Sequence, residues 1–222
     1  MAATLVRLQN VLQIIDASDY DHGKSVFYVG EIGVNDYFVA LSNNSVDVAV
    51  SLVPHIIDTI RSALTTMIAA GARTVVVSVS GMLPNRLRAA EAGCITRFIN
   101  ALAEHHNHML RMMLRELRSN YGRSLTLLYA DMYRPVVKAM ASPALYGFGD
   151  RPLATCCAGG AGPNNFNFIA FCGTPASTTC ADPSKFVSWD GIHFTEAANR
   201  FFARNMIKGL LSRGRGEYVA TD

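Results

Sequence analysis

Apolar residues recur every three or four positions in several stretches of the chain, which is the spacing of one face of an α-helix. Pro54 is expected to start or kink the second of these helices, and Gly71 to close it. Thr195 is a good N-cap for the last one. The pattern predicts helices over residues 4–16, 45–70, 95–117 and 196–210, with a further short helix that runs through residue 137.

Short apolar runs, rich in β-branched residues, separate the helices and predict strands over residues 25–29, 74–79 and 125–129. Strands that alternate with helices are typical of a parallel sheet, so the fold class is α/β. Residues 142–187 form a connection too long for ordinary loops, which indicates a functional or cross-linked segment. No internal repeat appears, and residues 1–222 are expected to form one domain.

Composition and charge narrow the class of protein. The chain has 222 residues, of which 50% are hydrophobic and 17% charged, and this suits one globular domain. A net charge of +3 with scattered basic residues gives no indication of a nucleic acid or an anionic membrane as partner. No apolar run reaches the roughly 18 residues of a membrane-spanning helix, and the first residues lack the features of a signal peptide.

Four of the five cysteines lie close together in the long connection, at Cys156, Cys157, Cys172 and Cys180. Two disulfides are the first interpretation; a metal site is the second, but paired C-x-x-C knuckles and a nearby histidine are lacking. A bond between the adjacent cysteines would be strained, which leaves two pairings open. Disulfides imply an oxidising compartment, and because no export signal precedes them we expect a chain that lacks its front.

The strongest candidate chemistry lies near the end of the chain, in Asp190-Gly191-Ile192-His193. Gly191 permits a tight turn, so that the carboxylate can accept a hydrogen bond from Nδ1 of the imidazole. The other ring nitrogen is then free to take a proton from a hydroxyl nucleophile, which is the arrangement of a Ser-His-Asp site. His193 is therefore the candidate base and Asp190 its orienter.

A second candidate segment follows the first predicted strand, at Gly33-Val34-Asn35-Asp36. Gly33 permits a turn at the carboxyl end of that strand, where open α/β sheets present functional side chains. By itself, the Asn-Asp pair is also typical of a turn in which Asp36 caps the next helix. Both interpretations are open on these residues alone.

Three blocks together resemble the plant GDSL esterase/lipases, members of the SGNH hydrolase superfamily. They are F-Y-V-G-E-I-G-V-N-D-Y, the cysteine-rich segments at 156–167 and 172–173, and V-S-W-D-G-I-H-F-T-E-A-A. The resemblance runs from residue 25 to the end, except for a shortened region near Asn85. It implies a flavodoxin-like three-layer sandwich with a parallel sheet whose N-terminal strand or strands are missing.

The resemblance also implies a function and roles for residues. Carboxylic esters, either lipid or small acyl esters, would be hydrolysed by acyl transfer without a cofactor, in a secreted protein. His193 and Asp190 would be catalytic, and Asn35 with Gly33 would form the oxyanion hole. Asn35 and His193 are then expected at the same, carboxyl-terminal edge of the sheet. Cys94 would have lost its partner in the shortened region and stay a free thiol.

The chain departs from the family in one decisive respect, because it contains no Gly-Asp-Ser block to supply the nucleophile. Ser78 and Ser80 lack the G-x-S-x-G pattern of a nucleophile elbow and are interpreted as structural. Of the three neighbouring histidines, His105 and His108 share a helix face, but apart from the adjacent Glu104 no third ligand lies one turn away on that face, so no metal site is predicted. Two hypotheses follow: a GDSL-type esterase represented here without its serine, or a truncated, non-catalytic relative that acts as a binding protein or is an inactive fragment.

Overall fold

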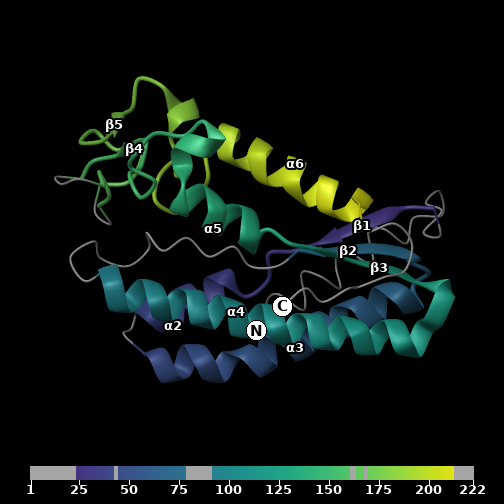
Figure 1. Ribbon diagram of the computed structural model, residues 1–222. Helices are drawn as coiled ribbons and strands as arrows, with labels where there is room; N and C mark the ends of the chain where they lie inside the picture. The colour runs from purple at the N-terminus through teal and green to yellow at the C-terminus, as the bar shows by residue number, and fades with distance from the viewer. Residues whose placement is uncertain (1–23, 43–44, 79–91, 161–163, 168–169, 213–222) are drawn as a thin grey trace. The chain divides into compact units, whose positions relative to one another are not determined.

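The computed structural model describes residues 24–42, 45–78, 92–160, 164–167 and 170–212 (Figure 1). The chain divides into two compact units, residues 1–80 with 102–130 and residues 81–101 with 131–222, and each is described by itself. The predicted helix over residues 4–16 lies outside the described residues. Among those described, no helix is long and apolar enough to cross a membrane.

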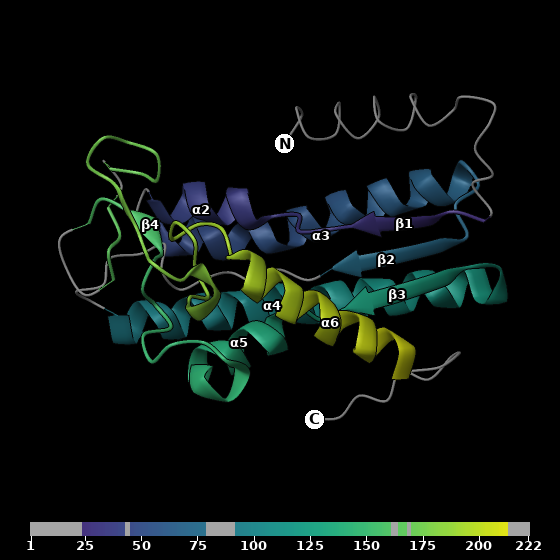
Figure 2. The same cartoon turned by 90° about the horizontal axis from the view of Figure 1, so that it is seen from above.

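The first unit is organised on a sheet of three parallel strands, β1 (Val26–Val29), β2 (Thr74–Ser78) and β3 (Thr126–Ala130). Their order is β1-β2-β3, with Val29 opposite Val77 and Val77 opposite Tyr129 (Figure 2). The central strand is buried along four of its five residues and has a hydrogen-bonded neighbour on each side. The three predicted strands and the α/β class are confirmed.

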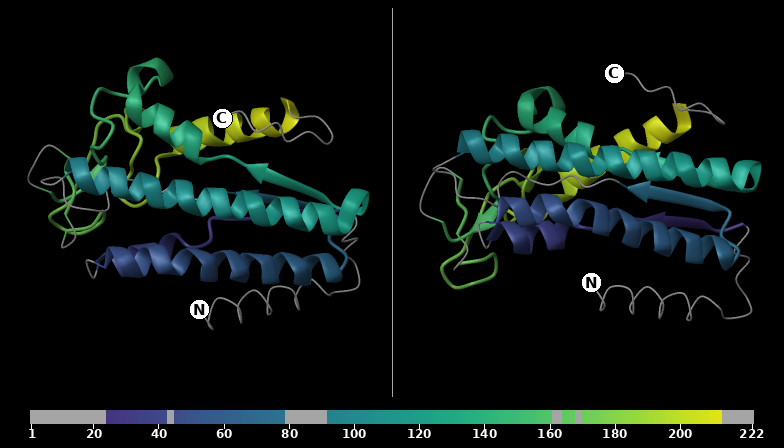
Figure 3. Two further views of the ribbon diagram at one scale, coloured as in Figure 1. Left: turned by 60° about the horizontal axis from the view of Figure 1, so that its bottom comes forward. Right: turned by 90° about the horizontal axis from the view of Figure 1, so that it is seen from below.

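Helices connect these strands. α2 (Val34–Ser42) and α3 (Val46–Ala69) lie between β1 and β2, and α4 (Ala92–Tyr121) precedes β3 with the short η3 (Gly122–Ser124). α3 and α4 run side by side, and Arg61 on α3 forms an ion pair with Glu116 on α4 at 2.8 Å (Figure 3). The buried stripe of α3 follows helical spacing: Ala49, Val53, Ile56, Ile57, Ile60, Ala63, Leu64, Met67 and Ile68.

One detail of a predicted helix is corrected, and one helix was not predicted. α3 begins at Val46 and continues through Pro54, so the proline does not start it. The closing role of Gly71 is confirmed: its φ is +104°, and its N–H donates to the carbonyl of Ile68 at 3.0 Å. α2 was not predicted at all, because its glycine and Asn-Asp pair were interpreted as a turn.

A buried polar pair joins α2 to α4 inside the first unit. The hydroxyl of Tyr37 and Nδ1 of His106 lie 2.8 Å apart, and both side chains are almost completely buried. Burial, with a smaller contribution from His105, lowers the pKa of His106 to about 4. Burial, with the charge of Asp36, raises the pKa of Tyr37. His106 is therefore a neutral core residue whose Nδ1 accepts a hydrogen bond from the buried hydroxyl of Tyr37.

The second unit holds the long connection and the last helix. After α5 (Tyr133–Ala141) the chain forms η4 (Pro143–Tyr146), β4 (Cys157–Ala158), β5 (Thr178–Thr179) and η5 (Pro183–Lys185), and it ends in α6 (Glu196–Ser212). β4 and β5 form an antiparallel pair. α6 contacts α5 and η5, and Phe202 on its buried face packs against Phe194 with ring centroids 4.7 Å apart.

Candidate active site

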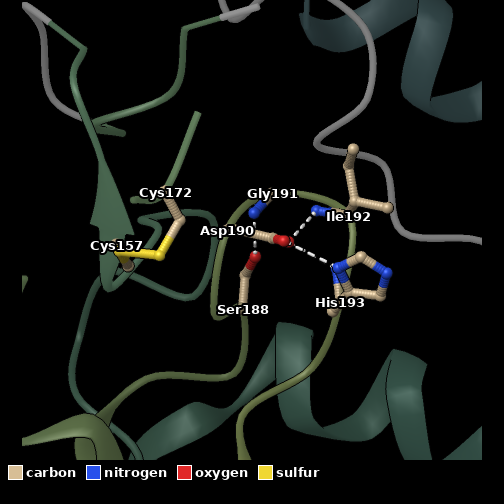
Figure 4. A network of polar contacts seen from close by, with 7 residues as sticks. All are labelled: Cys157, Cys172, Ser188, Asp190, Gly191, Ile192 and His193. Carbon is tan, nitrogen blue, oxygen red and sulfur yellow. Dashed lines mark hydrogen bonds and ion pairs between the residues drawn. A yellow bond between two sulfur atoms is a disulfide. The ribbon is translucent and has the colours of Figure 1, made fainter. Parts of the chain in front are cut away.

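The turn that carries Asp190 and His193 leads into α6. Nδ1–H of His193 donates to Oδ2 of Asp190 at 2.6 Å, as the spacing of the two residues predicts (Figure 4). The second ring nitrogen, Nε2, points away from Asp190, and the His193 side chain is 73% exposed. The imidazole is thus held from one side and accessible from the other, which is what a general base requires.

Asp190 organises this turn with both of its carboxylate oxygens. Oδ1 accepts hydrogen bonds from the backbone N–H groups of Ile192 at 2.8 Å and His193 at 2.7 Å. Burial alone would raise the pKa of Asp190, but the hydrogen bonds from His193 and Ile192 outweigh it and hold that pKa below its ordinary value. Asp190 therefore stays ionised at neutral pH and orients the imidazole.

Gly191 is required at this turn for two reasons. Its φ is +87°, a conformation that L side chains rarely adopt. A Cβ on Gly191 would also collide with the ring of Phe166. Its N–H donates to the buried hydroxyl of Ser188 at 2.8 Å, so that the turn is closed on both sides of Asp190 (Figure 4).

Two disulfides lie beside this turn. They join Cys156 to Cys180 and Cys157 to Cys172, which confirms the disulfide interpretation and selects one of the two open pairings. The smaller ring spans a sequence separation of 15 residues, and such a ring stabilises a folded protein by about 3 kcal/mol in the chain-entropy account. The predicted free thiol, Cys94, has its side chain outside the described part of the molecule.

The disulfide-bonded segment is hydrogen-bonded to the residues immediately before Asp190. The backbone N–H of Cys156 donates to the carbonyl of Ser188 at 3.1 Å, and that of Cys157 to the carbonyl of Trp189 at 2.7 Å. The N–H of Trp189 in turn donates to the carbonyl of His193 at 2.8 Å. The turn is therefore fixed to a covalently cross-linked support.

Thr195 fixes the exit of the turn into α6. Its hydroxyl accepts from the N–H of Ala198 at 3.2 Å, which confirms the predicted N-cap, and it donates to the carbonyl of Phe186 at 2.6 Å. The Thr195 N–H donates to the carbonyl of Val187 at 3.0 Å. His193 thus lies two residues from a well-anchored helix start.

The other predicted site residues lie in the first unit. Gly33 is buried with φ of +101°, and its carbonyl accepts from the N–H of Tyr37 at 3.0 Å. Asn35 lies in the first turn of α2 and is exposed. Asp36 also lies within that turn, so the interpretation of Asp36 as the cap of a following helix is wrong. Gly33 and Asn35 are brought together here, as are Asp190 and His193 in the second unit.

Comparison with known proteins identifies the family. The family described as GDSL-like lipase/acylhydrolase matches residues 2–206. Three Arabidopsis thaliana proteins, each named GDSL esterase/lipase, are 36%, 37% and 39% identical over 201, 195 and 204 residues. The chain belongs to the plant GDSL lipase/acylhydrolase family. The resemblance stated from the sequence is therefore confirmed.

The alignments with these GDSL relatives cover 84%, 82% and 84% of this chain but only 50%, 49% and 53% of the relatives. The chain thus spans about half the length of the curated relatives it matches. Its 222 residues include no Gly-Asp-Ser triplet. Ser78 is buried at the end of β2, and Ser80 lies outside the described residues.

For this GDSL family member, the sequence predicted the hydrogen-bonded pair of Asp190 and His193 but not the residues that support it. Ser188 and Phe166 both contact Gly191, and neither was singled out. The signal for Ser188 was its place three residues before a turn glycine, where serine often accepts from the backbone. Within the described residues, no group of three or more His, Cys, Asp or Glu side chains is arranged to hold a metal ion.

Proposed function

We propose that the chain supplies the base, its orienter and an oxyanion donor to a carboxylic ester hydrolase of the GDSL type. His193 is the general base, Asp190 fixes its tautomer, and Asn35 with the Gly33 segment stabilises the oxyanion. The observation that carries the proposal is the 2.6 Å hydrogen bond between Asp190 and His193, with the second ring nitrogen exposed.

The reaction proceeds by acyl transfer to a serine that these 222 residues do not contain. Nε2 of His193 takes the proton of the serine hydroxyl while its oxygen attacks the ester carbonyl carbon. The carbonyl oxygen becomes an oxyanion and accepts hydrogen bonds from the donors of the Gly33–Asn35 segment. His193 then returns the proton to the leaving alcohol, and water releases the acyl group by the same route.

The substrate class is a lipid or small acyl ester, in line with the esterase/lipase names of the relatives. The two disulfides favour an oxidising compartment, and we place the protein outside the cell. Residues 1–222 are taken as one domain of such an enzyme.

The experiment joins to this chain the segment of a full-length relative that carries the Gly-Asp-Ser block. The hybrid should hydrolyse short acyl esters of p-nitrophenol and show a burst of one acyl group per site. His193→Ala should abolish the burst, and Asp190→Asn should lower kcat by roughly 10⁴-fold, as in serine proteases. His55→Ala, on the exposed face of α3, is the matched control and should leave both unchanged.

A second candidate, a non-catalytic binding protein or inactive fragment, is favoured by the absence of a Gly-Asp-Ser triplet from these residues. The chain by itself should show no burst and no labelling by a serine-directed phosphonate. A hybrid that folds and binds ester substrates without turning them over would overturn the esterase proposal and support the binding protein.

A further inference from the structure

The turn that carries His193 is covered on one side by the ring of Phe166. Gly191, at the centre of the turn, is buried, and the space where its Cβ would lie is occupied by that ring. Phe166 lies 25 residues earlier, inside the ring closed by Cys157 and Cys172. A side chain from a distant loop therefore contacts the backbone between the base and its orienter.

Phe166 is held in place by its neighbours rather than by its own side chain alone. Asn165 has φ of +46°, and its carbonyl accepts from the hydroxyl of Thr155 at 2.6 Å. The Asn165 side chain accepts from the N–H of Gly160 at 3.2 Å, and Asn167 donates to the carbonyl of Gly159 at 3.2 Å. These bonds tie both sides of Phe166 to the backbone around the adjacent cysteines.

The same backbone also holds the other side of the turn. Cys157, whose sulfur closes the ring, donates its N–H to the carbonyl of Trp189 directly before Asp190 (2.7 Å). One cross-linked segment thus contacts the turn at two points: by a hydrogen bond to Trp189, directly before Asp190, and by the phenyl ring of Phe166 packed on Gly191. Rotation of the turn would have to displace one of the two contacts.

We propose that Phe166 is a positioning residue for His193, and that the Cys157–Cys172 disulfide acts through it to keep the imidazole in the Asp190-bonded tautomer. The inference rests on the proposed function for its significance, since it concerns the base of that reaction. It predicts which tautomer the His193 imidazole adopts, and this can be measured in this chain although the serine nucleophile is absent.

The test is the tautomer of His193 in protein labelled with 15N-histidine, read from the proton–nitrogen couplings of the imidazole at neutral pH. His193→Gln assigns the signal among the six histidines. In the wild type the proton should reside on Nδ1. Phe166→Ala should shift His193 toward the Nε2–H form that a free imidazole prefers, and Phe166→Leu, which keeps an apolar cover, should restore the Nδ1–H form.

Phe171→Ala is the matched control, because Phe171 is an exposed aromatic residue within the same loop closed by the Cys157–Cys172 disulfide. It should leave the tautomer unchanged. Cys157→Ser with Cys172→Ser should reproduce the Phe166→Ala spectrum in material that remains folded by circular dichroism. If the double variant does not fold, the comparison of Phe166→Ala with Phe166→Leu still decides.

A folded Phe166→Ala protein with an unchanged Nδ1–H signal would overturn the proposal. Failure of the proposed function is recognised separately. In that case the ester hydrolysis hybrid stays inactive although the tautomer responds to Phe166 as described.

Discussion

Acidification from pH 7 to pH 5 is expected to destabilise the first unit through His106. The His106 side chain is 1% exposed, and its Nδ1 lies 2.8 Å from the Tyr37 hydroxyl, so the folded protein has no room to hydrate an imidazolium. Its pKa is lowered from the ordinary 6.5 to about 4. The unfolded chain thus binds a proton in a pH range in which the folded chain does not.

The sign follows from this difference. A histidine with a lowered folded pKa contributes stability that is fully present above pH 6.5 and is lost as the pH falls from 6.5 toward 4. Each unit of pKa difference corresponds to about 1.4 kcal/mol, so the full loss is about 3 kcal/mol. Between pH 7 and pH 5 the loss from this group is about 2 kcal/mol.

Urea unfolding of the oxidised protein at pH 7 and pH 5, followed by circular dichroism, measures the loss. His106→Gln removes the titration but keeps an acceptor for Tyr37, and its free energy of unfolding should depend less on pH by about 2 kcal/mol. His108→Gln, an exposed residue of the same helix, should behave as the wild type. An equal pH dependence in wild type and His106→Gln would refute the reasoning.

Three further predictions concern single positions. Thr195→Ala should lower the free energy of unfolding by about 1 kcal/mol, because the N–H of Ala198 loses its cap, while Thr195→Ser should retain most of it in the same urea assay. Gly33→Ala should lower the melting temperature clearly, since φ is +101° and the new methyl would collide with Ile56. Gly122→Ala should lower the melting temperature less, because its new methyl would have nothing within 4 Å and only the backbone strain would remain. Thiol titration of unfolded, unreduced protein should find one free cysteine per chain, and mass spectrometry after alkylation should locate it at Cys94.

The long elements could be predicted from the sequence because their periodicity is strong. The stripe on α4 predicts residues 95–117, whereas the helix runs from Ala92 to Tyr121. The prediction stops short because residues 118–121 are mostly polar and residues 92–94 precede the first residue of the apolar stripe. α2 was missed although Tyr37, Ala40 and Leu41 are buried at helical spacing. The glycine before this nine-residue segment and the Asn-Asp pair within it favour a turn on local grounds. Packing against α3 stabilises the segment as a helix.

The contacts of the candidate site could likewise be predicted only in part. The hydrogen bond between Asp190 and His193 could be predicted because the two residues lie three positions apart and Gly191 permits the turn. The contact of Phe166 with Gly191 could not, since it depends on which cysteines pair and on the path of the loop between them. Cysteine spacing alone allowed two pairings, and the choice rests on the folded positions of β4 and β5.

The nested arrangement of the two disulfides has a consequence for proteolysis. Residues 158–171 lie inside both rings, because Cys157–Cys172 is enclosed by Cys156–Cys180. A protease that cuts once in this interval leaves the two chain fragments joined by two covalent bonds, with Asp190 and His193 still attached to their support. On a denaturing gel, such a nicked molecule would migrate as one band without reductant and as two bands with it.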